Sequence, residues 1–99
     1  MSKLANISVK IPFDFGDAGE LKLKRNRVLT ARYYYYFHIL RRRPDDIYIL
    51  LAENEFFLKP DTVYRILTED RQNNFLNELI QTSATSARLQ KMFPGWKWQ

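Results

Sequence analysis

The spacing of apolar residues divides the chain into a short alternating part and a longer helical part. Over residues 7–13, apolar and polar residues alternate, and a period of two predicts a strand, which Pro12 restricts to a sheet edge or an extended arm. Residues 16–19 read Gly-Asp-Ala-Gly, a turn signal, and leucines then alternate with lysines over residues 21–24. Residues 1–24 are therefore predicted to form an extended arm or a short β-hairpin.

The pattern changes to that of a helix at Asn26 and keeps it to about Arg42, with apolar residues every three or four positions. Asn26 is a good amino-terminal cap, and Pro44 ends the helix. Within the aromatic run of residues 33–37, three residues share the side that faces the core, namely Tyr33, Tyr36 and Phe37. The two that remain, Tyr34 and Tyr35, are predicted to be exposed or to be covered by the amino-terminal arm.

Further helices are predicted beyond Pro44. Asp45 or Asp46 caps one that ends near residue 54, Pro60 begins the next, and Thr68 or Asp70 begins a longer one. Residues 82–87 read as a polar linker before one more short helical turn. The inward positions of these helices are Ile47, Leu50, Leu51, Val63, Ile66, Leu67, Phe75, Leu76, Leu79, Ile80, Leu89, Met92 and Phe93. The fold is therefore predicted to be mainly α, a small helical bundle over residues 25–99.

Composition narrows the class of protein. The 99-residue chain has no cysteine and one histidine, His38, so thiolate metal sites are excluded and a lone imidazole does not make a zinc site. No motif of a nucleophile, a phosphate loop or a cofactor site is present, and no apolar run approaches the ~20 residues that cross a bilayer. We therefore expect a non-enzymatic protein that needs no cofactor or metal, lies in the cytoplasm and does not enter a membrane.

Positive charge is concentrated in the first half of the chain. Residues 1–43 contain ten Lys/Arg and three Asp/Glu (+7), and residues 44–99 contain six and eight (−2), which gives the net +5 of the chain. This asymmetry predicts one surface that favours a polyanion. The alternative is a solvated basic face that only keeps the protein in solution.

Residues 47–68 carry the most specific pattern. Leu51 and Ala52 are an apolar-small pair near the end of one helix, Leu58 is an apolar anchor in the turn, and Val63 and Ile66 lie three apart in the next helix. A helix that props a second helix across the major groove of DNA needs this order of small and apolar residues.

This segment, about 22 residues long, resembles the helix-turn-helix of bacterial regulators and transposase-like proteins. It departs from that family in the turn, where no Gly lies between Ala52 and Leu58 and the spacing between them is one residue longer than usual. Lys59 also replaces the usual Ser or Thr cap. The resemblance implies binding to double-stranded DNA, in the setting of a small transcriptional regulator or a mobile-element accessory protein.

The resemblance also implies a set of DNA-binding residues. The exposed positions of the second helix are Lys59, Asp61, Tyr64, Arg65 and Thr68. Arg65 is expected to contact a guanine edge and Lys59 a phosphate, whereas Asp61 repels phosphate. The alternative for Arg65 is an ion pair with Asp61 or Glu69 at helical spacing.

Basic residues outside the second helix are expected to supply phosphate contacts, which dominate affinity for nucleic acid. They are Lys22, Lys24, Arg25, Arg27, Arg41, Arg42 and Arg43. The alternative for residues 41–43 is compensation of the dipole at the end of their helix.

The carboxyl terminus is rich in aromatic area. Trp96 and Trp98 are predicted to fold back over the core; the alternative is a docking segment for a protein partner. The rival to DNA binding is therefore an interaction adaptor in which the helical hairpin of residues 45–68 is only structural.

Overall fold

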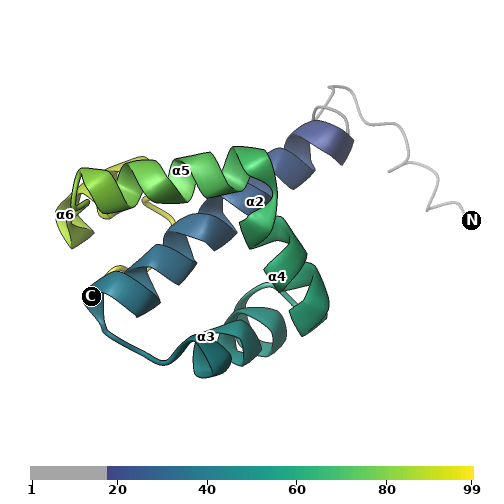
Figure 1. Cartoon of the computed structure of the whole chain (residues 1–99). Coiled ribbons are helices and arrows are strands. Elements are labelled where there is room, and N and C mark those ends of the chain that lie inside the picture. The colour runs from purple at the N-terminus through teal and green to yellow at the C-terminus, as the bar shows by residue number, and fades with distance from the viewer. Residues whose placement is uncertain (1–17) are drawn as a thin grey trace, which may run out of the picture.

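The computed structural model describes residues 18–99, and within them every regular element is helical (Figure 1). The mainly α fold is confirmed. The elements are, in order, α2 (Ala18–Tyr34) with its π-helical continuation η1 (Tyr35–Ile39), α3 (Pro44–Leu50) with its π-helical continuation η2 (Leu51–Glu55), α4 (Pro60–Thr68), α5 (Asp70–Gln81) and α6 (Ser86–Met92).

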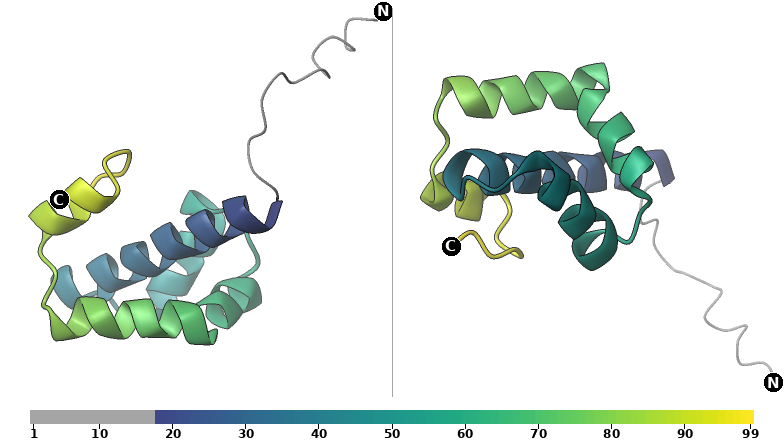
Figure 2. Two further views of the ribbon diagram at one scale, coloured as in Figure 1. Left: turned by 90° about the horizontal axis from the view of Figure 1, so that it is seen from above. Right: turned by 60° about the horizontal axis from the view of Figure 1, so that its bottom comes forward.

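The long helix α2 is the centre around which the other helices are arranged. It packs most extensively against α5, and α4 and η2 also pack on it. Figures 1 and 2 show α5 lying alongside α2, while α3 and α4 cover another side of it. A helix covered from several directions must present apolar residues around much of its circumference.

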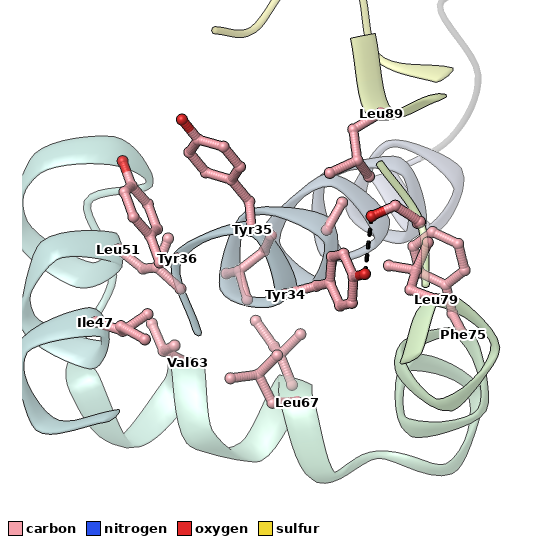
Figure 3. Packing of buried hydrophobic residues seen from close by; sticks show 14 of the residues in the cluster. Tyr34, Tyr35, Tyr36, Ile47, Leu51, Val63, Leu67, Phe75, Leu79 and Leu89 are labelled. Carbon is pink, nitrogen blue, oxygen red and sulfur yellow. Dashed lines mark hydrogen bonds between the residues drawn. The ribbon is translucent and has the colours of Figure 1, made fainter. Parts of the chain in front are cut away.

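The core follows from that arrangement. Residues from every helix of this part meet in it. Ile47, Val63, Leu79 and Leu89 are fully buried there (Figure 3). Leu29 of α2 is also fully buried in the same core. Burial of one such side chain contributes about 1.5–3 kcal/mol. The core is therefore assembled from contacts between segments distant in sequence.

The prediction that Tyr34 and Tyr35 are exposed is wrong; the alternative that the amino-terminal arm covers them rests largely on residues outside 18–99. The two tyrosines are 4% and 3% exposed, and the Tyr34 hydroxyl donates to the carbonyl oxygen of Ala84 at 2.8 Å. The ring of Tyr35 meets that of Trp98 edge-on, with 5.5 Å between the ring centroids. The carboxyl-terminal part of the chain covers the side of α2 that its own periodicity does not mark as apolar.

The predicted second strand of the amino-terminal hairpin is also wrong. Leu21 and Leu23 lie in the first turns of α2, where both are exposed. Asn26 does not cap this helix, because the helix begins at Ala18 and Asn26 is buried within it. Lysine, leucine and glutamate are good helix formers, so the helix extends past its packed part at little cost. The predicted strand over residues 7–13 lies outside the described residues.

Smaller corrections concern helix boundaries. Pro44 is not only a helix-ending residue but also the first residue of α3, and Arg43 is the cap. Asp45 and Asp46 therefore lie in the first turn of α3, where their carboxylates interact favourably with the positive end of the helix dipole. Pro60 begins α4 as predicted. The cap of α5 is Glu69, one position from either predicted residue.

Two further corrections concern α5 and the segment after it. Ile80, predicted to point inward, is 39% exposed. The predicted linker over residues 82–87 is a tight connection, in which Ala84 is buried and the Thr85 side chain accepts from the backbone N–H of Arg88 at 3.2 Å to cap α6.

Candidate nucleic-acid interface

Helix α4 separates its residues cleanly into a buried side and an exposed side. Val63, Ile66 and Leu67 are at most 5% exposed, because positions three and four apart fall on one helix face. The residues predicted to contact DNA all lie on the exposed side: Lys59, Asp61, Tyr64, Arg65 and Thr68.

Tyr64 and Thr68 have contacts that limit how their side chains can bind a ligand. Tyr64 is 57% exposed, and its ring meets the Tyr48 ring of α3 edge-on with centroids 6.2 Å apart, which fixes one side of the ring. The Thr68 hydroxyl donates to the carbonyl oxygens of Tyr64 and Arg65 at 3.0 and 3.2 Å. Thr68 is therefore free to accept a hydrogen bond from a ligand but must reorient to donate one.

The turn before α4 has an unusual backbone in the segment of the long spacing and the missing glycine, two of the three departures from the helix-turn-helix pattern. The π-helical turn η2 contains Ala52, and such a turn holds one residue more than an α-turn. Phe57 has φ 55°, the left-handed conformation that Gly adopts without cost. The long spacing and the missing glycine are thus absorbed by the backbone between Ala52 and Leu58, where the Leu58 amide donates to the Ala52 carbonyl at 2.9 Å.

Phe56 and Phe57 differ in their surroundings. The ring of Phe56 stacks on that of Trp96 with centroids 5.2 Å apart. Phe57 is 78% exposed. The Phe56 ring therefore packs against the carboxyl-terminal segment, whereas Phe57, which has a left-handed φ, lies on the surface.

Arg65 faces the amino-terminal half of α2 across a hollow of about 360 Å³. We call it the α2–α4 hollow; it is lined by Lys22, Arg25, Asn26, Thr62, Arg65, Ile66 and Glu69. Within residues 18–99, Arg65 forms no ion pair with Asp61 or Glu69. The structure thus brings three of the basic residues named from the sequence together.

A second hollow, of about 210 Å³, lies between α2 and α5. This α2–α5 hollow is lined by Glu20, Leu23, Lys24, Arg27, Arg71, Gln72 and Phe75. The guanidinium carbon of Arg27 lies 3.9 Å from the centre of the Phe75 ring, a cation–π contact that holds Arg27 against the helix pair. Arg71 was not expected here, and nothing in its local sequence distinguishes it from a solvated charge.

Arg41, Arg42 and Arg43 do not join either hollow. They are exposed in the connection between η1 and α3, after the helix rather than in its last turn as predicted. Arg41 has φ 58°. The 15 residues from Arg25 to Ile39 span about 20 Å, since the 14 steps between them rise about 1.5 Å each. Of the basic residues named from the sequence, those on this long helix therefore form two groups, one in the amino-terminal half of α2 and one just after η1.

Arg32 is the most enclosed cation of residues 18–99. It is 6% exposed, and its guanidinium donates to both carboxylate oxygens of Glu55 at 2.9 and 2.8 Å and to the Tyr36 hydroxyl at 2.8 Å. It also donates to the backbone carbonyl of Lys97. The charge of Arg32 is thus neutralised inside the protein, unlike that of Arg65.

The Arg32 guanidinium also anchors the carboxyl terminus. The guanidinium carbon of Arg32 lies 5.2 Å from the Trp96 ring centre and 4.8 Å from that of Trp98, and Trp98 is 1% exposed. The predicted fold-back of this segment is confirmed. Burial and a hydrogen bond with Glu55 raise the pKa of Tyr36 to about 12. Burial alone would lower the pKa of Arg32, but the hydrogen bond and charge of Glu55 outweigh it and raise that pKa.

No known family model, curated protein or solved structure matches this chain. Among the helices of residues 18–99, none combines the length and the apolar character needed to cross a membrane. The same part of the chain holds no group of three His, Asp or Glu side chains placed to bind a metal ion.

Proposed function

We propose that this protein binds double-stranded DNA through the exposed side of α4, with basic residues on α2 beside it. The observation that carries the proposal is the position of Arg65. It lies on the exposed side of α4, without an ion pair to either neighbouring carboxylate, next to Lys22 and Arg25 of α2. A short helix with a free polar side and adjacent cations matches what a major-groove reader requires.

The dimensions of α4 suit this role. A helix with its side chains is about 10–12 Å across, and the major groove of B-DNA is about 12 Å wide. Tyr64 and Thr68 lie on the side that would face base edges, with Thr68 as an acceptor. Lys59, at the amino-terminal end of α4, is placed to contact a phosphate, and Asp61 opposes close approach of the backbone there.

The turn before α4 supports the resemblance to a helix-turn-helix. The π-helical η2 takes up the extra residue, and Phe57 takes the left-handed φ for which the family commonly uses Gly. Ala52 is 1% exposed, and a small buried residue at this position is consistent with the pattern.

Fluorescence anisotropy of a labelled random duplex, measured at two salt concentrations, tests the proposal directly. Binding is expected at low salt and should weaken steeply as salt increases, because each phosphate contact contributes about −0.9 to the slope of log affinity against log salt. If the wild type shows no salt-dependent affinity for any duplex, the DNA proposal is wrong.

The arginines of the η1–α3 connection are expected to add contacts at a second place on the duplex. Replacing Arg41, Arg42 and Arg43 with Ala should weaken binding to all sequences alike and flatten the salt slope by up to about three units. Lys91→Ala, on α6, removes an exposed charge elsewhere and serves as the control. The variants must keep the wild-type melting temperature.

The rival function, a protein-interaction adaptor, is favoured by one observation. Phe57 is 78% exposed, the most exposed of the large apolar side chains in residues 18–99. If Phe57→Ser leaves duplex affinity unchanged but abolishes capture of a specific protein that the wild type binds without DNA, the turn serves a protein partner.

A further inference from the structure

The α2–α4 hollow contains more positive charge than its contacts neutralise. Three cations line it, Lys22, Arg25 and Arg65, against the single carboxylate of Glu69. No ion pair within residues 18–99 involves any of these three cations. In contrast to Arg32, these side chains keep their charge available to a ligand.

Arg25 is held in place without being neutralised. Its Nε and Nη2 donate to the Asn26 side-chain oxygen at 3.0 and 2.8 Å. Asn26 is 7% exposed, and its backbone carbonyl also accepts from the Thr30 hydroxyl at 2.9 Å. A guanidinium has five N–H donors, so Arg25 retains three of them, and an amide acceptor leaves its charge intact. The rotamer is therefore ordered in advance on a buried support.

We propose that the α2–α4 hollow seats a phosphate of the nucleic-acid backbone, and that Arg65 is a phosphate contact rather than a base contact. This inference rests on the proposed function. The hollow has a volume of about 360 Å³, many times the ~30 Å³ that one water takes in the liquid, so a phosphate group with part of its hydration fits in it. Converging cations suit an anion, whereas one guanidinium suffices for a guanine edge.

The position of Arg65 on α4 supports the same assignment. Thr62, Arg65 and Glu69 lie three and four residues apart, on the edge of α4 that borders α2, and all three line the hollow. Tyr64 and Thr68 do not line it. The base-reading side of α4 is therefore left to those two residues, and Arg65 fixes the helix against the backbone beside the groove.

The α2–α5 hollow on the other side of α2 supplies a matched control. It too has three cations and one carboxylate in its lining, so removing two cations there changes the net charge by the same amount at the same end of the molecule. It differs in that Arg27 is engaged by the Phe75 ring rather than free. Comparison of the two hollows separates a specific phosphate site from a diffuse positive field.

The experiment compares Lys22→Gln/Arg65→Gln with Lys24→Gln/Arg71→Gln in duplex-binding titrations over a range of salt concentrations. All four residues are exposed, so both variants should fold. The first variant should flatten the salt slope by about one unit for every duplex sequence, because one phosphate contact is lost. The second should leave the slope nearly unchanged, because the inference assigns the phosphate contact to the α2–α4 hollow and withdraws the one expected of Lys24 from the sequence. Equal effects of the two variants would overturn the inference and leave only a diffuse field.

A different result would restore Arg65 as a base contact. In that case Lys22→Gln/Arg65→Gln would lose discrimination between a selected site and random duplex, with the slope unchanged. Wild-type protein that fails to bind any duplex would instead refute the proposed function itself. The two failures are thus distinguishable.

Two further measurements complete the test. Glu69→Gln should strengthen binding severalfold, because it removes the carboxylate of the hollow; Glu69 makes no side-chain cap hydrogen bond to α5, so its fold is not at risk. NMR of the Arg25 and Arg65 Nε–H signals should show larger shifts with duplex than with inorganic phosphate at equal ionic strength. Saturation by inorganic phosphate that duplex cannot displace would indicate a small-anion site and contradict the backbone assignment.

Discussion

Arginines in the two halves of α2 have opposite roles. Arg25, in the amino-terminal half, is half-buried and bonded to the neutral amide of Asn26. Arg32, seven residues later, is 6% exposed and bonded to the carboxylate of Glu55. The partner decides the role: an amide orients a cation and leaves its charge available, whereas a carboxylate cancels the charge and lets the cation serve as a structural joint.

The difference also predicts which half matters for stability. A buried pair broken by removal of one partner leaves an uncompensated charge and typically costs about 3–5 kcal/mol, whereas changes to exposed charges stay within about 0.5 kcal/mol. We therefore expect the half of α2 around Arg32 to hold the fold, and the half around Arg25 to contact the ligand.

Deletion of residues 94–99 should have the largest effect. It removes the buried Trp98 ring and the Lys97 carbonyl that accepts from Arg32. Loss of a buried aromatic costs about 3–5 kcal/mol, so urea unfolding should show a fall of at least that size. Native tryptophan emission should be blue-shifted and move to the red on unfolding. Red emission from the native protein would contradict the enclosure of the carboxyl terminus against the half of α2 around Arg32.

Glu55→Gln isolates the charge within the enclosed half. The glutamine amide keeps one acceptor for Arg32 but lacks the negative charge that compensates the guanidinium. The Glu55 side chain is 12% exposed, so that charge is lost from a largely buried position. We expect a loss of about 3 kcal/mol, at the low end of the range for a broken buried pair. Glu69→Gln makes the same change on the surface and should alter the unfolding free energy by less than about 0.5 kcal/mol. Equal costs for both variants would refute the distinction.

The pH dependence of stability at high pH tests the same network through Tyr36. Its pKa is about 12 in the folded protein and near 10 in the unfolded chain, so the folded state holds the proton more firmly. Its contribution to stability is therefore complete below pH 10 and is lost as pH rises towards 12. Urea unfolding between pH 9 and pH 12 should show this loss, and Tyr36→Phe should reduce it.

Phe57→Gly should have a smaller effect, and one of opposite sign. The left-handed φ of Phe57 costs about 1–2 kcal/mol for a residue with a Cβ, and the greater freedom of Gly in the unfolded chain takes back about 0.4–1 kcal/mol. Thermal unfolding should therefore show a gain of up to about 1 kcal/mol. A clear loss of stability would mean that the exposed ring makes a packing contribution.

Lys22→Gln/Arg65→Gln should have the smallest effect on stability, within about 0.5 kcal/mol by urea unfolding. Its effect on duplex binding should nonetheless be measurable as the change in salt slope. A large stability loss would show that the cations of the α2–α4 hollow hold the fold as Arg32 does, and the comparison between the halves of α2 would fail.

Local sequence signals predicted most helices correctly, but not every segment adjacent to a helix. Pro60 and the three-four spacing of Val63, Ile66 and Leu67 gave α4 correctly, because proline geometry and amphipathic period are properties of a short segment. The same kind of local signal predicted the wrong element for Leu21 and Leu23. Two alternating leucines fit a strand, but a helix anchored by packing further along extends through them.

The sequence by itself determined the mainly helical class and the two faces of α4, since both depend on residues a few positions apart. Only the tertiary structure decided which arginine is neutralised and which is available. Arg32 and Glu55 are 23 residues apart, and Arg25 and Arg65 are 40 apart. Their surroundings are set by how α2 packs against α4 and the carboxyl terminus, and no periodic pattern within one helix records where a second helix will cross it.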